Sequence, residues 1–131
     1  MKYFVLDLLA CPVCKSTNLK LHVIEEEEED TGLDPGKVKC RSYCHYLGKP
    51  AGEVSIEECR VCVKKRIKTG VIVCRDCGRW YPIIETIAVM LDDEYRDERI
   101  DKRFVKEYLD RIPEEVKGLM KIPDLNKLQG Q

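Results

Sequence analysis

Eight cysteines, grouped in four close pairs, constrain the fold of this 131-residue chain more than any other feature. The first and last pairs have Cys-x-x-Cys spacing, in "CPVCK" and "CRDCGR". Two cysteines at this spacing can wrap a tight turn so that both thiolates face one ion, and two such turns complete a tetrahedral zinc site. Four thiolates leave no open coordination position, so the pattern predicts a structural ion rather than a catalytic one. In chain order the pairs are Cys11 and Cys14, Cys40 and Cys44, Cys59 and Cys62, and Cys74 and Cys77.

Spacing alone allows the four pairs to share two zinc ions as neighbouring, alternate or nested pairs. The strand pattern favours nesting. Apolar and polar residues alternate in "LKLHVI" after the first pair, and "TGVIVC" runs into the last pair. Antiparallel pairing of these two segments would bring the outer cysteines to one ion. The predicted first zinc site is therefore Cys11, Cys14, Cys74 and Cys77.

The inner cysteines would then cross-link the segment between the two strands. Three states are open for them: a second zinc ion, disulfides of the kind found in some hyperthermophile cytosols, or uncoordinated thiols. We expect Zn2+ as the cofactor, with one ion in the outer site and a second ion if the inner set also binds metal. The inner set is Cys40, Cys44, Cys59 and Cys62.

These patterns predict an α+β fold: a small zinc-ribbon β core with a cysteine-rich insertion and C-terminal helices. Apolar residues recur at helical spacing from Ile100 to Ile112, and "PEEVKGLMK" predicts a second, short helix. Whether the longer helix packs on the ribbon or on a partner is open. The predicted parts are the ribbon core at 1–24 plus 70–92, the insertion at 25–69, and the helical segment at 93–131.

Charge is abundant but balanced. Charged residues make up 36% of the chain, against roughly 25% in average soluble proteins, which leaves a small core that a metal would help to stabilise. The formal net charge of -1 gives no overall basic field for gathering nucleic acid. We interpret the acidic run at 25–30 as a solvated loop, and the basic stretch at 60–68 as a loop or strand edge.

The N-terminal "MKYFVLDLLAC" resembles a lipoprotein signal only superficially. Asp7 interrupts an apolar run that is already short, and only one lysine precedes it. No apolar run approaches the roughly 20 residues needed to span a bilayer. We expect a cytoplasmic protein without membrane contact, in which cysteines stay reduced and paired thiols bind metal.

An apolar segment, "YPIIETIAVML", follows the last cysteine pair. Apolar residues on both faces of a strand indicate that both faces are covered, one by the ribbon and the other by a C-terminal helix or a partner. Pro82 cannot donate a ladder hydrogen bond, so it suits the start of the strand. An exposed edge of this kind can add a strand to another protein's sheet.

The chain resembles the multifunctional methyltransferase subunit family, the tRNA methyltransferase 112 homologues. The resemblance rests on "LLACPVCK", then C-x-x-C-G-x-x-Y-P-I and an I-x-V-M-L ending, over residues 1–24 and 70–92. It implies a non-catalytic, zinc-binding partner that forms heterodimers with class I S-adenosylmethionine-dependent methyltransferases acting on tRNA, rRNA or a translation release factor. It also implies that RNA is contacted only through the complex, in tRNA processing and translation.

The chain departs from the family pattern in two places. The cysteine-bearing insertion is one, and the apolar segment is the other, where Thr86 replaces a glycine and Ala88 replaces a proline. We therefore expect a longer strand in place of a tight glycine turn. A partner would contact this strand and the apolar residues before the first cysteine pair. The predicted partner-binding residues are Leu8, Leu9, Pro82, Ile83, Ile84, Ile87, Val89 and Leu91.

The chain carries no glycine-rich phosphate loop or nucleophile elbow, so we expect no enzymatic activity of its own. The alternative function is a nucleic-acid-binding zinc ribbon, acting as a transcription or translation accessory factor. In that case base stacking and phosphate contacts would come from Arg75, Arg79, Trp80 and Tyr81.

Overall fold

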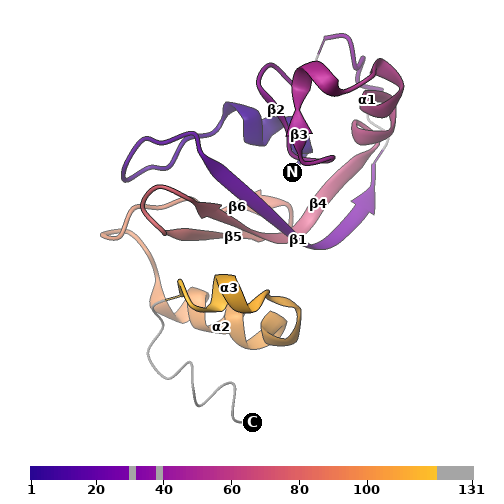
Figure 1. Ribbon diagram of the computed structural model, residues 1–131. Coiled ribbons are helices and arrows are strands. Elements are labelled where there is room, and N and C mark those ends of the chain that lie inside the picture. The colour runs from indigo at the N-terminus through magenta and orange to yellow at the C-terminus, as the bar shows by residue number, and fades with distance from the viewer. Residues whose placement is uncertain (30–31, 38–39, 121–131) are drawn as a thin grey trace.

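The computed structural model describes residues 1–29, 32–37 and 40–120. The end of the predicted C-terminal segment, residues 121–131, lies outside the described residues. Figure 1 shows a central sheet with helices α2 and α3 on one side, and the inserted segment with α1 on the other. No helix in the described part of the chain is long and apolar enough to cross a membrane.

A four-stranded antiparallel sheet forms the centre of the fold, and the predicted α+β class is confirmed. Leu19 at the start of β1 lies opposite Cys74 at the end of β4, so the first and last cysteine pairs meet at the same end of the sheet. The predicted pairing of "LKLHVI" with "TGVIVC" is thus correct. In spatial order the strands are β1 (Leu19–Glu28), β4 (Lys65–Cys74), β5 (Trp80–Ile84) and β6 (Ile87–Ala88).

The acidic run is not a solvated loop, as its composition had indicated. It continues β1 to Glu28, opposite the basic start of β4. Glu26 and Lys65 form an ion pair at 3.2 Å, and Arg66 pairs with both Glu27 and Glu29. Opposite charges directly across a strand pair stabilise the register. The two charge runs therefore neutralise each other, and the sheet extends beyond residues 24 and 70.

The apolar segment is a hairpin, so the prediction of one long strand is wrong. β5 and β6 are joined by a two-residue turn at Glu85 and Thr86, whose φ angles are 48° and 70°. Two-residue hairpin turns with positive φ at both positions usually carry Asn or Gly. Here the turn is supported from outside the hairpin, because the Thr86 N–H donates to the Lys68 carbonyl at 2.9 Å. Lys68 is an unpaired, bulged residue of β4.

The C-terminal helices pack on one face of the sheet, which settles the choice that the sequence left open (Figure 1). Helix α2 (Glu98–Tyr108) begins at the N-cap Asp97, whose side chain accepts the Arg99 N–H. A 3-10 turn (Leu109–Arg111) and the short α3 (Glu114–Lys117) follow. The buried cluster on this face is Ile24, Val71, Val73, Trp80, Phe104, Val105, Ile112, Val116 and Met120.

The N-terminal 3-10 helix η1 (Tyr3–Leu8) and the insertion cover the opposite face. Met1 exchanges two backbone hydrogen bonds with Ile67 of β4, of 3.0 and 2.7 Å, and these hold η1 against the sheet. The core on this face includes Leu6, Ile72, Tyr81 and Ile83. The insertion contains β2 (Tyr43–Cys44), β3 (Lys49–Pro50), η2 (Ala51–Glu53) and α1 (Ile56–Cys62). The division into core, insertion and helical segment stays a prediction.

Candidate metal centre

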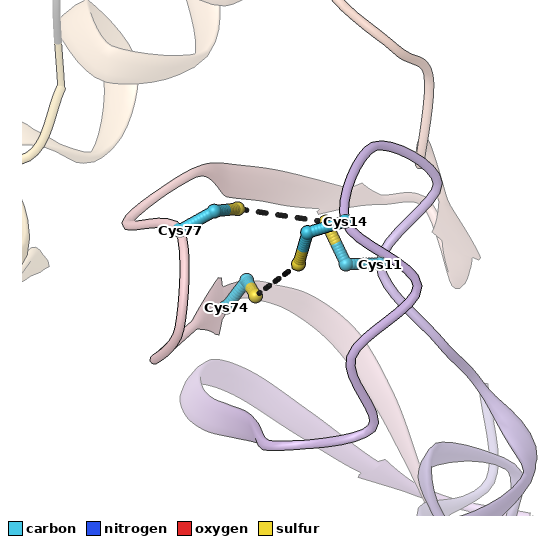
Figure 2. Close-up of side chains that lie close together, drawn as sticks. All are labelled: Cys11, Cys14, Cys74 and Cys77. Atoms are coloured by element: carbon cyan, nitrogen blue, oxygen red, sulfur yellow. Dashed lines mark hydrogen bonds between the residues drawn. The ribbon is translucent and has the colours of Figure 1, made fainter.

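The four outer sulfurs lie together at the end of the β1–β4 pair, although up to 66 residues separate them in the chain (Figure 2). Cys11 Sγ is 3.7 Å from Cys77 Sγ, and Cys14 Sγ is 3.5 Å from Cys74 Sγ. All four ligand atoms lie within 4.8 Å of one another. Cys11 and Cys74 have no exposed surface, while Cys14 faces solvent.

This arrangement fits a tetrahedral metal ion. With zinc–sulfur bonds of about 2.3 Å, a regular tetrahedron has sulfur–sulfur edges of about 3.8 Å. The two short sulfur–sulfur distances, 3.5 and 3.7 Å, are close to that edge, whereas a disulfide would need bonding distance. A cluster of four cysteines at these distances could hold a metal ion such as zinc.

Two turns with the same backbone geometry present these sulfurs. In the first, the Lys15 N–H donates to the Cys11 carbonyl at 2.9 Å, and Lys15 has a φ of 66°. In the second, the Gly78 N–H donates to the Cys74 carbonyl at 2.9 Å, and Gly78 has a φ of 77°. Glycine suits this conformation best, and lysine adopts it in the first turn at some steric cost.

The pKa values of the two buried thiols, Cys11 and Cys74, shift in opposite directions. Burial raises the pKa of Cys11, but N–H groups of Cys14 and Val13 and the Tyr81 hydroxyl outweigh burial and lower the pKa to about 6. Burial raises the pKa of Cys74 to about 12, against the lowering effect of the Cys77 and Asp76 N–H groups. N–H groups aimed at sulfur favour the thiolate, which is the form that binds metal.

Tyr81 supports the ligand Cys11 by a hydrogen bond from outside the cysteine cluster. Its side chain is fully buried, and its hydroxyl lies 3.1 Å from Cys11 Sγ. Burial, with the hydrogen bond to Cys11, raises the pKa of Tyr81, so the hydroxyl keeps its proton and donates it to a thiolate. Sequence analysis had assigned Tyr81 to base stacking and had missed this role. Its position four residues after Cys77 was the available signal.

We predict that Tyr81→Phe weakens binding of the outer metal by about 10–100-fold, the usual effect of losing a hydrogen bond to a ligand. The ring would still fill its buried site, so the fold should persist. Competition against a zinc-binding dye measures the affinity. Tyr95→Phe is the control. The Tyr95 side chain is 66% exposed, so loss of its hydroxyl should leave the metal affinity unchanged. Equal affinities for Tyr81→Phe and wild type would remove Tyr81 from the metal centre.

Asp76 ties the two turns together. Its carboxylate accepts hydrogen bonds from the Ser16 hydroxyl and from Asn18 Nδ2, the latter at 3.3 Å. These bonds, that of Ser16 first, lower the pKa of Asp76. Ser16 and Asn18 follow the first cysteine pair, and Asp76 lies between Cys74 and Cys77 of the last pair. This contact therefore fixes one turn relative to the other. Nothing in the sequence pattern had indicated it.

The inner cysteines lie apart from this centre, around a cavity on the side of the insertion. Cys44 and Cys62 are buried, while Cys40 and Cys59 are half-buried. All four line the same cavity, whose other walls include Phe4 and Val54. Within the described residues, the outer sulfurs are the only group of metal-ligating side chains close enough together to hold an ion, so the inner sulfurs are more widely spaced.

The predicted partner-binding residues separate into two sets. Pro82 and Ile83 are fully buried in the chain's own core, so they are not available to a partner. Three are exposed: Leu8 at 67%, Ile87 at 65% and Leu91 at 39%. The half-buried residues are Leu9, Ile84 and Val89.

The residues named for nucleic-acid binding do not form a stacking surface. Trp80 is only 5% exposed and packs against Phe104, and Tyr81 is fully buried. Arg79 makes two hydrogen bonds of 2.9 and 2.7 Å to the Asp93 carboxylate, so its charge is neutralised. Arg75 alone of the four is exposed. Aromatic rings that stack on bases need an accessible face, which these rings lack.

Comparison with known families gives one match. The family model described as "Trm112p-like protein" matches residues 2–85, which include both turns of the metal centre and the inner cysteines. The matched span covers more than half of the chain. Comparison of the chain with curated proteins and with solved structures finds no match.

Proposed function

We propose that this chain, which belongs to the Trm112p-like family, is a non-catalytic zinc-binding subunit that activates class I S-adenosylmethionine-dependent methyltransferases. The substrates of such complexes would be tRNA, rRNA or a translation release factor, and the working form would be a cytoplasmic heterodimer. The family membership supports a small methyltransferase partner in general. The observation that carries the proposal is an edge of the molecule with exposed apolar side chains.

The apolar edge consists of Leu8, Leu9, Ile87, Val89, Met90 and Leu91. Leu9, Met90 and the adjacent Ala88 pack against the same core cluster, so η1 and the β6 region lie on a common face of the sheet. Leu8 and Ile87, each about two-thirds exposed, point away from that cluster. Large apolar side chains gathered at an exposed edge are typical of a protein interface rather than of a solvated surface.

β6 is also the last strand of the sheet in its spatial order. Its two residues pair with β5 on one side only. The next residue continues this pairing, because the Val89 N–H donates to the Pro82 carbonyl at 2.9 Å. The outer side of β6 therefore offers main-chain groups to a partner's strand, and strand addition would combine those hydrogen bonds with contacts from Ile87.

The candidate metal centre and the apolar edge are connected through β5 and through the chain between Leu9 and Cys11. Cys77 is joined to the hairpin through β5, and Tyr81 contacts Cys11 from the middle of that strand. Cys11 comes two residues after Leu9. A metal ion held by these turns would fix the relative positions of η1 and the hairpin, so the edge would be preformed before a partner binds. Preformed edges avoid an ordering cost on binding.

Co-purification from native extract tests this function. The tagged chain should capture a methyltransferase, and capture should persist at high salt because the contact is apolar. A nucleic-acid-binding ribbon would instead retain RNA by itself, with an affinity that falls steeply as salt rises. Salt-sensitive RNA retention without a captured methyltransferase would contradict the proposal. Methyl transfer by the captured enzyme with and without the chain measures activation.

A further inference from the structure

The turn at Cys44 has the backbone geometry of the two turns in the outer centre. The Gly48 N–H donates to the Cys44 carbonyl at 2.8 Å, and Gly48 has a φ of 70°. The corresponding bonds from Lys15 and Gly78 in the outer turns measure 2.9 Å, with φ angles of 66° and 77°. "CHYLGK" is therefore a third turn of the same form, with Leu47 at the position of the second cysteine.

The Cys44 sulfur receives the same kind of support as the outer sulfurs. The Leu47 N–H, three residues along, donates to Cys44 Sγ at 3.4 Å. The outer sulfurs accept N–H groups at the same offset, from Cys14 to Cys11 and from Cys77 to Cys74. The Cys44 turn thus directs a backbone N–H at its sulfur in the same way as the two outer turns.

Helix α1 brings the remaining thiols to the cavity. Cys59 and Cys62 are three residues apart in α1, so their side chains lie on one face of the helix. The helix is fixed at its start by a capping box between Ser55 and Glu58. The Glu58 carboxylate also lines the cavity, but it is engaged by the Ser55 N–H and hydroxyl at 3.1 Å each. An ion in this cavity would therefore be bound by the sulfurs rather than by this carboxylate.

Asp7 anchors the loop that carries Cys40 and Cys44. Its carboxylate accepts the N–H groups of Arg41, Ser42 and Tyr43 at 2.7, 3.1 and 3.1 Å. These three residues lie between Cys40 and Cys44, so the loop that carries both thiols is held against η1. Sequence analysis had used Asp7 only as the residue that breaks an apolar run.

We propose that Cys40, Cys44, Cys59 and Cys62 form a second metal site that binds a thiophilic divalent cation such as zinc. Its ligands come from the Cys44 turn, the loop before it, and one face of α1. All four thiols line one cavity, and four cysteines are a donor set that a tetrahedral zinc ion takes. To reach one ion from this wider spacing, the sulfurs would have to move inward by rotation about their Cα–Cβ bonds.

This second site would join the insertion to the ribbon. Cys62 belongs to the core cluster that includes Tyr3 and Leu6 of η1, and Phe4 of η1 lines the cavity. Lys2 adds hydrogen bonds of 2.7 Å to the carbonyls of Val63 and Glu29. An ion held here would therefore fix α1 and the Cys44 turn against the element that begins the apolar edge.

Native mass spectrometry of the purified chain tests the second site. We expect two zinc ions per chain in the wild type and one in the double variant Cys44→Ser/Cys59→Ser. Leu47→Ala is the matched control, because Leu47 lies in the same turn without being a ligand, and it should retain both ions. The metal count needs no partner, so it is independent of the proposed function.

A single zinc ion in the wild type, with the inner thiols open to alkylation or joined in disulfides, would overturn the second site. If the double variant does not fold, the number of zinc ions per wild-type chain decides between the two outcomes. Release of both ions from the wild type by titration with a mercurial would confirm that thiolates bind them. Alkylation followed by peptide mapping then assigns each released thiol to the inner or the outer set.

Discussion

Cys74→Ser should unfold the ribbon and abolish methyltransferase capture together. Cys74 is fully buried at the end of β4, so serine there would leave the outer ion with three sulfurs and a buried hydroxyl. Structural zinc supplies about 10–16 kcal/mol of apparent free energy in small zinc-dependent folds, and a whole domain is stable by only about 5–15 kcal/mol. Losing most of that contribution exceeds what a core of this size can offset.

Circular dichroism, zinc content and partner capture, measured on the same preparation, check this prediction. Cys59→Ser is the matched control: it makes the same chemical change in the inner set, and the outer ion should remain. A Cys74→Ser protein that kept its fold and still captured the methyltransferase would show that the outer ion does not hold the ribbon together. The proposed coupling of metal and partner would then be wrong.

Ile87→Asp should weaken partner binding by at least about thirtyfold while leaving zinc content and fold unchanged. The Ile87 side chain is 65% exposed in the isolated chain, so a carboxylate there stays hydrated until a partner covers it. Burying that charge against an apolar surface would cost about 2 kcal/mol or more, the range of an interface hot spot. The loss should appear mainly as faster dissociation.

Calorimetry or surface plasmon resonance with the captured methyltransferase measures this loss. Ile100→Asp is the matched control, because Ile100 is 46% exposed on α2, which packs on the opposite face of the sheet from the apolar edge. Its affinity should equal that of the wild type. Equal affinity for Ile87→Asp and the wild type would move the interface away from β6.

The sheet and the position of the outer cysteines follow from local sequence patterns. Alternation in "LKLHVI" and the apolar run in "TGVIVC" are enough to predict two strands, and antiparallel pairing then places the outer thiols at one end. The helical spacing from Ile100 to Ile112 likewise predicts α2 and the buried Phe104 and Val105, but Ile100 is exposed and Ile112 lies beyond the end of α2. These features depend on short-range periodicity, which a single sequence contains.

Three features depended on contacts that are distant in sequence, and single-sequence reasoning missed or misassigned them. The turn at Thr86 lacks glycine but is supported because the Thr86 N–H donates a hydrogen bond to the Lys68 carbonyl. The acidic run becomes a strand because a basic strand lies opposite it. Tyr81 follows the second turn of the candidate metal centre, where an aromatic residue is equally compatible with an exposed or a buried position. By contrast, Gly48 repeats the offset of Gly78 from its cysteine, and this signal could have identified the turn at Cys44.

A crystal structure of the purified chain with diffraction data collected at the zinc absorption edge tests the central claim most directly. We expect an anomalous peak between Cys11, Cys14, Cys74 and Cys77, about 2.3 Å from each sulfur. Four outer sulfurs lying apart, or lying together without a peak between them, would contradict the claim that one metal ion organises the ribbon and its apolar edge.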